Sequence, residues 1–389
     1  MKPSSRGVFL MCLVSFLQGM VFYAPVAALY RTQAGVSLGQ IALIESISWL
    51  VSLALEIPWG LVTARIGYRA SLMACCGVYF VSKLVFWQAD SFGDFLTERL
   101  LLSLVTAGLS GCDSAYLYLC AGKNAHRALG FYEALGMAGL LTASAVFALF
   151  VGDAYRLAAL LTVGSYGLAA LAALALPGVP APPRQTALRQ LGCLAAQLKA
   201  KPRFALFIVA GALLAESAQF VTVFLSQLLY AEKGFGPTAL TGAYLACTAV
   251  GLCAGASHAV TARLGARTLG RVCFWSAGCV CAVLSFGTSA PLAVACVLAL
   301  RAAADVYRPW ELARQNACAL RWGPPSVLVS GYSMLAGLVS SGMNAGLSRA
   351  SDVSLSAACA ACAGACVLAA FLFEAGFSAQ STESKENPS

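Results

Sequence analysis

One apolar stretch of the sequence, residues 290–318, carries charged side chains at helical spacing. Their separations of 4, 3, 3 and 3 residues place alternating signs along one face of a helix, and they are Arg301, Asp305, Arg308, Glu311 and Arg314. Inside a bilayer each such group is unfavourable by ~2.5–3.5 kcal/mol on insertion scales. The stripe is typical of a water-filled pathway that binds an anionic or zwitterionic substrate or relays protons. The alternative is a self-neutralising ladder that stiffens the helix.

Two further carboxyl groups suit proton transfer. Glu216 is flanked by Leu213, Leu214 and Ala215 and has no basic residue one turn away. Burial without a basic partner favours the neutral acid, a state from which a proton is readily exchanged when the surroundings change. Asp113, within the apolar stretch 94–121, is the second candidate. For both residues the alternative is a carboxyl held by a nearby hydroxyl or arginine.

An internal repeat relates these residues to one another. The basic turn 62–69 (VTARIGYR) returns as 260–267 (VTARLGAR), with six of eight positions identical and an offset of 198 residues. At the same offset Asp113 matches Glu311, and Gln18 matches Glu216. Each copy of the turn joins two apolar stretches, so one half of the molecule repeats the other.

The composition places these elements in a membrane. Apolar residues make up 60% of the 389 residues, charged residues 11%, and the mean hydropathy is +0.79. Soluble domains carry about 25% charged residues, so a water-soluble globule is excluded. The net charge of +9 resides in short turns rather than on a basic face with interleaved aromatics, which argues against nucleic acid as a partner. The first apolar run is too long for a cleaved signal and is expected to stay in the membrane.

Runs of about 20 apolar residues predict membrane-spanning helices. Twelve are predicted, at 7–30, 38–62, 70–88, 94–121, 128–151, 156–176, 204–231, 238–261, 268–288, 290–318, 325–348 and 353–377. The predicted domains are an N-terminal six-helix bundle (1–176), a cytoplasmic linker (177–203), a C-terminal six-helix bundle (204–377) and a polar tail (378–389). Leu188, Leu191 and Leu198 recur at helical spacing in the linker, which predicts a short surface helix. The tail is expected to be disordered.

The basic residues predict the orientation. With a cytoplasmic N-terminus, that side receives 17 of the 25 Lys and Arg residues, including those of the linker and of both copies of the repeated turn. The opposite side receives four, namely Arg31, Arg156, Lys233 and Arg349. Both termini are therefore predicted to be cytoplasmic, and the two halves to be parallel repeats about an axis along the membrane normal.

The repeated turn resembles the signature of the major facilitator superfamily of secondary transporters, G-x-L-A-D-R-x-G-R-[RK]. Gly60, Arg65, Gly67 and Arg69 match it, whereas Ala64 replaces its Asp and Tyr68 an Arg. The lead 56–60 (EIPWG) and the stretch 109–118 (LSGCDSAYLY) resemble the E-I-P-T-G and S-G-A-D motifs of a bacterial branch. The implied fold is all-α, integral to the membrane, with twelve helices in two six-helix pseudo-repeats. The fifth predicted span contains Gly136 and Gly139 but lacks the Gly-Pro motif associated with proton-coupled drug antiporters, which argues against a drug antiporter.

The resemblance also implies where the site residues lie. In this family spans one, four, seven and ten line a central cavity, so the expected substrate and proton pathway comprises Gln18, Tyr23, Asp113, Tyr116, Glu216, Gln219, Arg301, Asp305, Arg308 and Glu311. The residues expected to form the gating motif are Glu56, Gly60, Arg65, Gly67, Arg69, Arg263, Gly265 and Arg267. Without the signature Asp at position 64, the cytoplasmic gate must be latched differently.

The remaining polar residues have simpler interpretations. Lys83 and Arg99 lie within about two turns of the outer surface and are expected to extend their ammonium and guanidinium groups to it. Glu56 and Glu133 lie toward the cytoplasmic end, where pairing with the basic turns is expected. Cys359, Cys362 and Cys366 share a helix face with no His or acidic partner, so no metal site is predicted.

The resulting hypothesis is a secondary active transporter of the cytoplasmic (inner) membrane, monomeric, without a cofactor, working on a small molecule by alternating access and coupled to protons. Export is favoured over uptake by the bacterial resemblance alone. The alternatives are an uptake permease or facilitator, and a receptor or sensor that no longer transports. A membrane enzyme is disfavoured because the sequence has neither a metal-ligand set nor a loop longer than the 27-residue linker. The sequence also lacks a nucleotide-binding G-x-x-x-x-G-K-[ST] motif, which argues against ATP as the energy source.

Overall fold

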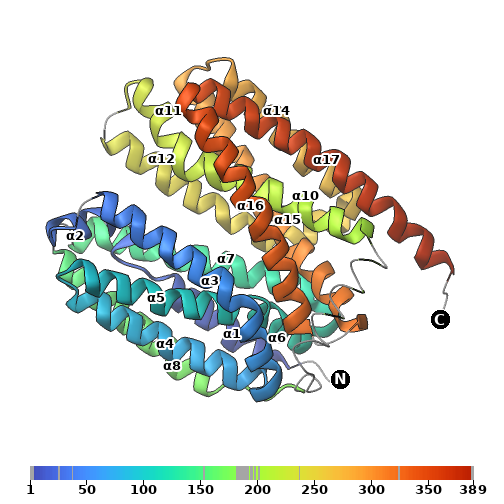
Figure 1. The fold of residues 1–389 in the computed structure, drawn as a ribbon, viewed down its shortest axis with the longest axis horizontal. Helices are drawn as coiled ribbons and strands as arrows, with labels where there is room; N and C mark the ends of the chain where they lie inside the picture. Colours follow the sequence, from blue (N-terminus) through green and yellow to red (C-terminus); the bar gives the residue numbers. More distant parts are fainter. Residues whose placement is uncertain are drawn as a thin grey trace. The chain divides into compact units, whose positions relative to one another are not determined.

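The computed structural model describes residues 4–24, 27–36, 38–151, 154–180, 192, 196, 199, 202–235, 237–322 and 325–386, and all secondary structure in them is helical. Figure 1 shows the arrangement of the helices within each part of the chain. The helices up to residue 174 are α1 (Ser5–Gly19), α2 (Ala27–Gln33), α3 (Leu38–Ile66), α4 (Tyr68–Gln88), α5 (Phe92–Leu109), α6 (Cys112–Ala121), the 3₁₀ helix η2 (Gly122–Asn124), α7 (Ala125–Val146), the π-helix η3 (Phe147–Val151) and α8 (Tyr155–Leu174).

The helices of the later part begin after the linker. They are α10 (Pro202–Gln219), the π-helix η4 (Phe220–Leu225), α11 (Ser226–Glu232), α12 (Pro237–Val250), the 3₁₀ helix η5 (Gly251–Ala256), α13 (Ser257–Leu264), α14 (Ala266–Ser285), α15 (Ala290–Trp322), α16 (Pro325–Val353) and α17 (Leu355–Glu386). The surface helix predicted in the linker lies almost entirely outside the described residues. The tail predicted to be disordered is instead helical as far as Glu386, because α17 simply continues and extending an existing helix requires no new nucleus.

The chain forms two compact units. The first comprises residues 1–193 and 313–333, and the second comprises residues 194–312 and 334–389. The division near residue 193 falls within the predicted linker. Residues 313–333, at the junction of α15 and α16, belong to the first unit although they follow the predicted start of the C-terminal bundle.

In the first unit, α1 packs along α7 and α8, and α5 packs along α3 and α4. The contact of α1 with α7 is made by backbone. A side-chain carbon added to Gly19 would overlap the carbonyl of Gly136, and one added to Gly139 would overlap the carbonyl of Phe16. Small residues allow membrane helices to approach in this way. These two glycines of the fifth predicted span therefore serve close packing.

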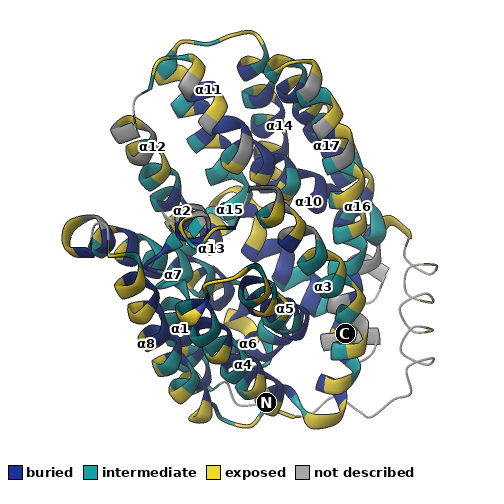
Figure 2. Ribbon diagram, turned by 60° about the vertical axis from the view of Figure 1, so that its left-hand side comes forward, coloured by how far each residue is buried: buried dark blue, intermediate teal, exposed yellow. Residues whose placement is uncertain are grey.

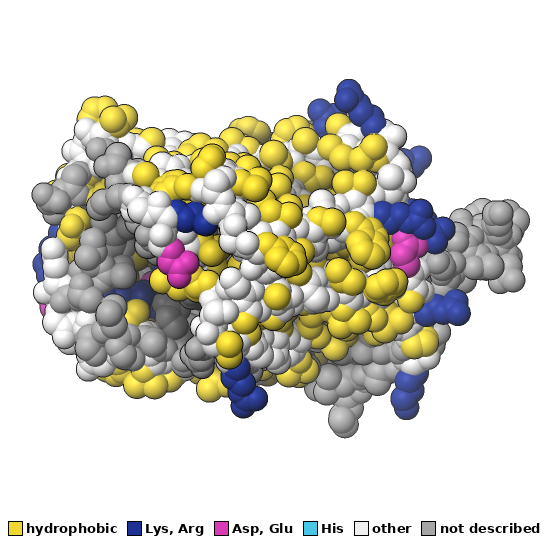
Figure 3. Space-filling model, turned by 90° about the horizontal axis from the view of Figure 1, so that it is seen from above, with side chains coloured by type: hydrophobic (Ala, Val, Ile, Leu, Met, Phe, Trp, Pro, Cys, Tyr) yellow, Lys and Arg dark blue, Asp and Glu magenta, His cyan; other side chains and the backbone are white. Residues whose placement is uncertain are grey.

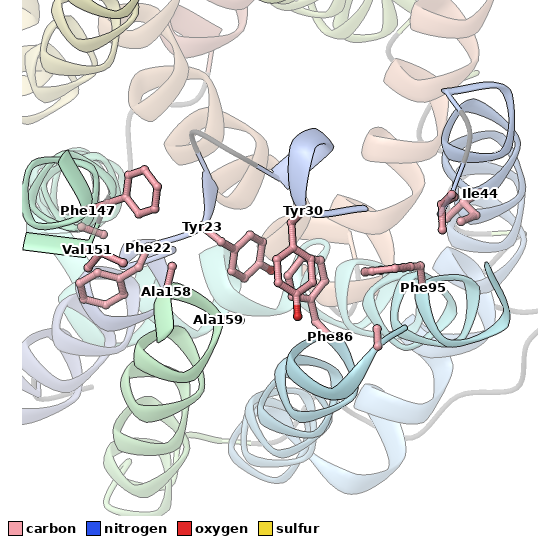
Figure 4. Close-up of a cluster of buried hydrophobic side chains, with 13 residues drawn as sticks. Phe22, Tyr23, Tyr30, Ile44, Phe86, Phe95, Phe147, Val151, Ala158 and Ala159 are labelled. Carbon is pink, nitrogen blue, oxygen red and sulfur yellow. The ribbon is translucent and has the colours of Figure 1, made fainter. Parts of the chain in front are cut away.

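Aromatic side chains fill the cores of both units. In the first unit Tyr23, Tyr30, Phe86 and Phe95 point toward one another (Figure 4), and the rings of Tyr23 and Phe86 stack with centroids 4.0 Å apart. In the second unit α17 packs along α10 and α14. Its core includes Phe207, Phe274, Tyr307, Trp310 and Phe373.

The surfaces of the helices are those of a membrane protein. Most helices carry buried residues on one side and exposed residues on another (Figure 2), and exposed side chains such as Leu149 and Phe150 are apolar. In Figure 3 hydrophobic side chains are spread over much of the visible face, and Lys and Arg form only a few separate groups on it. Among the described residues, eight helical segments are long and apolar enough to cross a membrane, or nine if the bent pair Ile47–Glu56 and Pro58–Ile66 is one span.

Candidate functional site

The two copies of the repeated turn have the same backbone conformation. Gly67 (φ 87°, ψ 159°) joins α3 to α4, and Gly265 (φ 80°, ψ 149°) joins α13 to α14. Only glycine adopts such positive φ angles readily, because it has no Cβ. The Gly67 N–H donates to the Thr63 carbonyl at 2.8 Å, and the Gly265 N–H donates to the Thr261 carbonyl at 2.9 Å. Sequence identity at an offset of 198 residues is thus matched by local geometry.

The second arginine of each turn reaches another helix of its own unit, α8 in the first unit and α17 in the second. Arg69 donates from Nη2 to the carbonyl of Leu174 at the C-terminal end of α8, at 3.1 Å. Arg267 donates to Glu374 on α17 at 2.8 Å, and Arg271 also pairs with Glu374. The first arginines of the turns are exposed, and Ala64, in the place of the signature Asp, is 2% exposed. Each turn is therefore fastened within its unit without that Asp.

The first predicted span of each half departs from regular α-helix at a similar position, by a break in the first half and by a π-helix in the second. Helix α1 ends at Gly19 and α2 begins at Ala27, whereas α10 ends at Gln219 and continues as the π-helix η4. At the first interruption, side chains of α8 bind the released backbone groups. Thr162 accepts a hydrogen bond from the Phe22 N–H, and Ser165 and Tyr166 donate to carbonyls of α1 and the residue after it. The break is thus a supported feature of the fold.

The polar residues directly before the α1 break and before η4 have neutral partners. Glu216 accepts a hydrogen bond on Oε1 from the Asn344 amide of α16 at 2.6 Å and is half-buried. An amide orients a carboxyl group but does not neutralise its charge. Gln18, the residue matching Glu216, donates to the Cys76 thiol of α4 at 3.4 Å. Gln219, one turn beyond Glu216, is exposed.

The charged residues of α15 pair along the helix. Arg301 donates from Nε to Asp305 at 2.6 Å, and both side chains are about one-fifth exposed. Arg308 lies 3.6 Å from Glu311, whose side chain is 3% exposed against 47% for Arg308. The Glu311 carboxylate occupies the space left by the missing side chain of Gly211 on α10. Arg301 and Asp305 thus neutralise each other along the helix, as the alternative interpretation of the charged stripe predicted. The Arg308 side chain remains accessible to solvent.

Two predicted site residues lie on α6. The helix starts after a break at Ser110 and Gly111, whose φ is +73°. Asp113 therefore sits in the first turn of α6, where a carboxylate is favoured by the helix dipole. It accepts hydrogen bonds from the Tyr132 hydroxyl at 3.1 Å and from the Ser114 N–H at 2.5 Å. Tyr116 is fully buried in the first unit and donates to the carbonyl of Pro177 at 2.8 Å.

A buried ion pair lies in the first unit where the sequence predicted none. Lys83 on α4 and Glu98 on α5 are 3.1 Å apart, with side chains 5% and 1% exposed. Lys83 also donates to the Tyr23 hydroxyl at 3.0 Å and lies over the rings of Tyr23, Tyr79 and Tyr166, at 5.4 to 5.9 Å from their centroids. The prediction that Lys83 extends to the outer surface is wrong, because Glu98 and three aromatic faces enclose its ammonium group.

Comparison with known proteins identifies the family. The family model of the Major Facilitator Superfamily matches residues 8–307, which is more than half of the chain. The chain belongs to the major facilitator superfamily. The resemblance carried by the repeated turn is thereby confirmed, together with a membrane transporter fold made of helices.

Solved structures of superfamily members share this fold. The fucose:proton symporter FucP of E. coli matches with a TM-score of 0.77 at 13% identity, over 94% of this chain and 97% of that chain. The human organic anion transporter MFSD10 (TETRAN) matches with a TM-score of 0.76 at 16% identity, over 96% and 100%. A structure of FucP in the outward conformation gives 0.77 at 14% identity, over 94% and 97%. Identities this low establish the fold alone. No curated protein matches the sequence.

The sequence of this superfamily member does contain an indication of the Lys83–Glu98 ion pair. Lys83 and Glu98 lie about equally far from the loop 89–91 that joins α4 and α5. In an antiparallel pair of helices such residues lie at the same level, so opposite charges there are expected to meet. The depth of Lys83 below the outer surface gives no information about this acid on the neighbouring helix.

Proposed function

We propose that this protein is a secondary active transporter that moves a small molecule across the cytoplasmic membrane by alternating access, coupled to protons. Membership of the superfamily supports transport. The observation that carries the proposal is a departure from regular α-helix at nearly corresponding places of the two repeats, the break between α1 and α2 beside Gln18 and the π-helix η4 beside Glu216. Irregular helical segments at corresponding positions of two repeats mark substrate and ion sites in transporters. Unwound backbone is tolerated in a membrane only where protein or a cavity satisfies it, and π-helical turns occur frequently at functional sites.

The proposal includes twelve membrane crossings in two six-helix repeats, with both termini in the cytoplasm. The segment Phe92–Val151 counts as one of the eight apolar candidates but has 60 residues. At 1.5 Å per residue a helix of that length exceeds a hydrocarbon core of about 30 Å roughly threefold. It therefore corresponds to two of the predicted spans. Helices α1 with α2, and α16, supply spans beyond the apolar candidates.

We assign proton coupling to Glu216 first and to Asp113 second. The only hydrogen-bond partner of the Glu216 carboxyl in the described part of the chain is the neutral amide of Asn344, at 2.6 Å. A carboxyl held by an amide is free to change its protonation state without breaking an ion pair. Arg308, with 47% of its side chain exposed, is our candidate for holding an anionic or zwitterionic substrate. Arg301 and polar residues of the first and seventh spans would assist it.

A thermal-shift screen followed by transport assays tests this function. Purified protein is screened against metabolites and drugs, with fucose and organic anions included because proteins of the same fold act on them. Compounds that stabilise the protein are then added to proteoliposomes containing a pH dye. We expect substrate-dependent proton movement in the wild type and its loss in Glu216→Gln. Asp90→Asn removes an exposed carboxyl and is the matched control.

The other outcomes separate the alternatives. Proton movement that persists in both Glu216→Gln and Asp113→Asn would reject the coupling assignment and leave transport intact. Substrate exchange without proton movement in the wild type would favour an uptake permease or facilitator. Binding without any exchange would favour a receptor or sensor on a transporter fold. Export is the direction we propose, and vesicles of defined orientation decide it.

A further inference from the structure

Glu56 lies at a bend in α3. The helical segments Ile47–Glu56 and Pro58–Ile66 meet at 48°. Pro58 has no N–H, and its ring crowds the preceding turn, so it bends a helix from within. The carboxyl group of Glu56 is thus carried by the last residue before the bend.

The surroundings of this carboxyl group are almost devoid of polar partners. Ser110 donates a long hydrogen bond of 3.5 Å to Glu56 Oε1. The other oxygen, Oε2, is buried and has no hydrogen-bond partner among the described residues. Pairing with the basic turn was the expectation from sequence, but Arg65 at the end of α3 is exposed and forms no ion pair with Glu56 in the described part of the chain.

The contact with Ser110 joins two breaks in the first unit. Ser110 lies between α5 and α6, directly before Gly111 with its positive φ. The same ends of α3 and α5 are pressed together, since a side-chain carbon on Gly108 would overlap the indole of Trp59. Any movement of the α3 bend relative to the α5–α6 break therefore changes the environment of the Glu56 carboxyl group.

Among the described residues, no cation of the neighbouring elements pairs with Glu56. The titratable and charged side chains of the adjoining elements include Arg69 and Cys75 on α4, Asp94, Glu98 and Arg99 in the first half of α5, and Cys112 and Asp113 on α6. None of them hydrogen-bonds or ion-pairs with Glu56 within the described residues. A buried carboxylate is strongly unfavourable when one oxygen has no hydrogen bond and the other has only a long one, whereas a neutral carboxylic acid is tolerated there.

We propose that Glu56 is a proton-binding residue of this transporter. The proposal rests on the proposed transport function and adds a coupling group to Glu216 and Asp113. In the conformation described, the proton is held on Oε2 and the Ser110 hydroxyl donates to Oε1. Separation of the α3 bend from the α5–α6 break admits water, and the O–H bond of the acid breaks to leave a hydrated carboxylate and a released proton.

Infrared spectroscopy tests this without any substrate. Difference spectra of purified protein in lipid nanodiscs are recorded below and above neutral pH. We expect a C=O band of a buried protonated carboxylic acid that is lost in Glu56→Gln and retained in Asp90→Asn and Glu216→Gln. Heat stability should fall as the pH rises from mildly acidic values to neutral in the wild type and level off above neutral, because only in the lower range does the folded state bind a proton that the unfolded state lacks. Glu56→Gln should flatten that dependence.

A second variant guards against misfolding of Glu56→Gln. Ser110→Ala keeps the acid but removes its hydroxyl donor, so the band should persist at a shifted frequency. A spectrum of protonated carboxylic acids that is unchanged by Glu56→Gln, or unchanged by Ser110→Ala, overturns the proposal. Because no substrate is involved, these results are independent of the proteoliposome assay. If substrate drives proton movement but the spectrum of Glu56→Gln is unaltered, the proposed transport function is retained and only the role of Glu56 is rejected.

Discussion

Among single residues, the Lys83–Glu98 pair has the sharpest energetic consequence. A buried ion pair gives little net stability, but removing one partner leaves an uncompensated charge. We expect Lys83→Met to destabilise the protein by about 3–5 kcal/mol. The double variant Lys83→Met with Glu98→Leu should recover most of that loss. Thermal unfolding in detergent, with folded protein monitored by size-exclusion chromatography, measures both.

The double variant also separates two roles for the pair. If the pair serves packing alone, the double variant transports like the wild type once it folds. If the charges take part in the transport cycle, the double variant folds but fails to transport. Equal instability of the single and double variants would contradict our account, because the damage would then not come from the unpaired carboxylate. Tyr23→Phe, which removes only the hydroxyl that Lys83 contacts, should cost about 1 kcal/mol.

Residue types predicted which chemistry is present, but not which partners meet. Glu216 was expected to lack a basic neighbour along its helix, and in the described chain its partner is the Asn344 amide, 128 residues away. Glu56 was expected to pair with the basic turns, which lie at a similar depth in the membrane. The Pro58 bend brings the carboxyl group to Ser110 instead, and a bend angle is not written in any local pattern.

At the level of elements, the twin turns should respond alike to the same substitution. Gly67 and Gly265 both have positive φ with ψ near 150°, a region that residues with a Cβ avoid at a cost of about 1–3 kcal/mol. We expect Gly67→Ala and Gly265→Ala to destabilise the protein by similar amounts in this range. Gly164→Ala is the matched control, since Gly164 lies within α8 with open space around it and alanine favours a helix.

This comparison tests the repeat at the level of structure rather than sequence. A large effect at one turn and none at the other would mean that the two turns contribute differently to stability, despite their shared sequence and hydrogen bonds. Alanine tolerated at both turns would mean that neither glycine is needed for its backbone conformation. The assay is thermal unfolding of the purified variants in detergent.

The elements themselves were largely predictable, because runs of apolar residues dominate this sequence. The predicted span 156–176 and α8 (Tyr155–Leu174) agree within two residues at each end. Breaks inside spans were not predicted. Gly111 and the π-helices η3 and η4 lie in apolar runs whose composition does not change, and their geometry depends on contacts such as those of α8 with the α1 break. Periodicity reports a continuous helix there, and tertiary contacts decide where it bends.

For the whole molecule, the distribution of charge predicts how the chain crosses the membrane. The loop at Asp90 and the loop at Gly287 are expected on the outer side, and the loop at Lys123 on the cytoplasmic side. Protease-cleavable tags inserted at these three loops and at the C-terminus test the topology in right-side-out vesicles. We expect cleavage of the first two tags in intact vesicles and of the other two only after the membrane is opened.

The C-terminal tag shows whether the number of membrane crossings is even or odd. An even number, such as twelve, returns the C-terminus to the side of the N-terminus, whereas an odd number places it outside. Nine crossings, the larger count of apolar candidates, would expose the C-terminal tag and place the two basic turns on opposite sides. Twelve crossings place both turns, with Arg65, Arg69, Arg263 and Arg267, at the cytoplasmic surface. A C-terminal tag cleaved in intact vesicles would therefore contradict both the repeat and the proposed alternating-access mechanism.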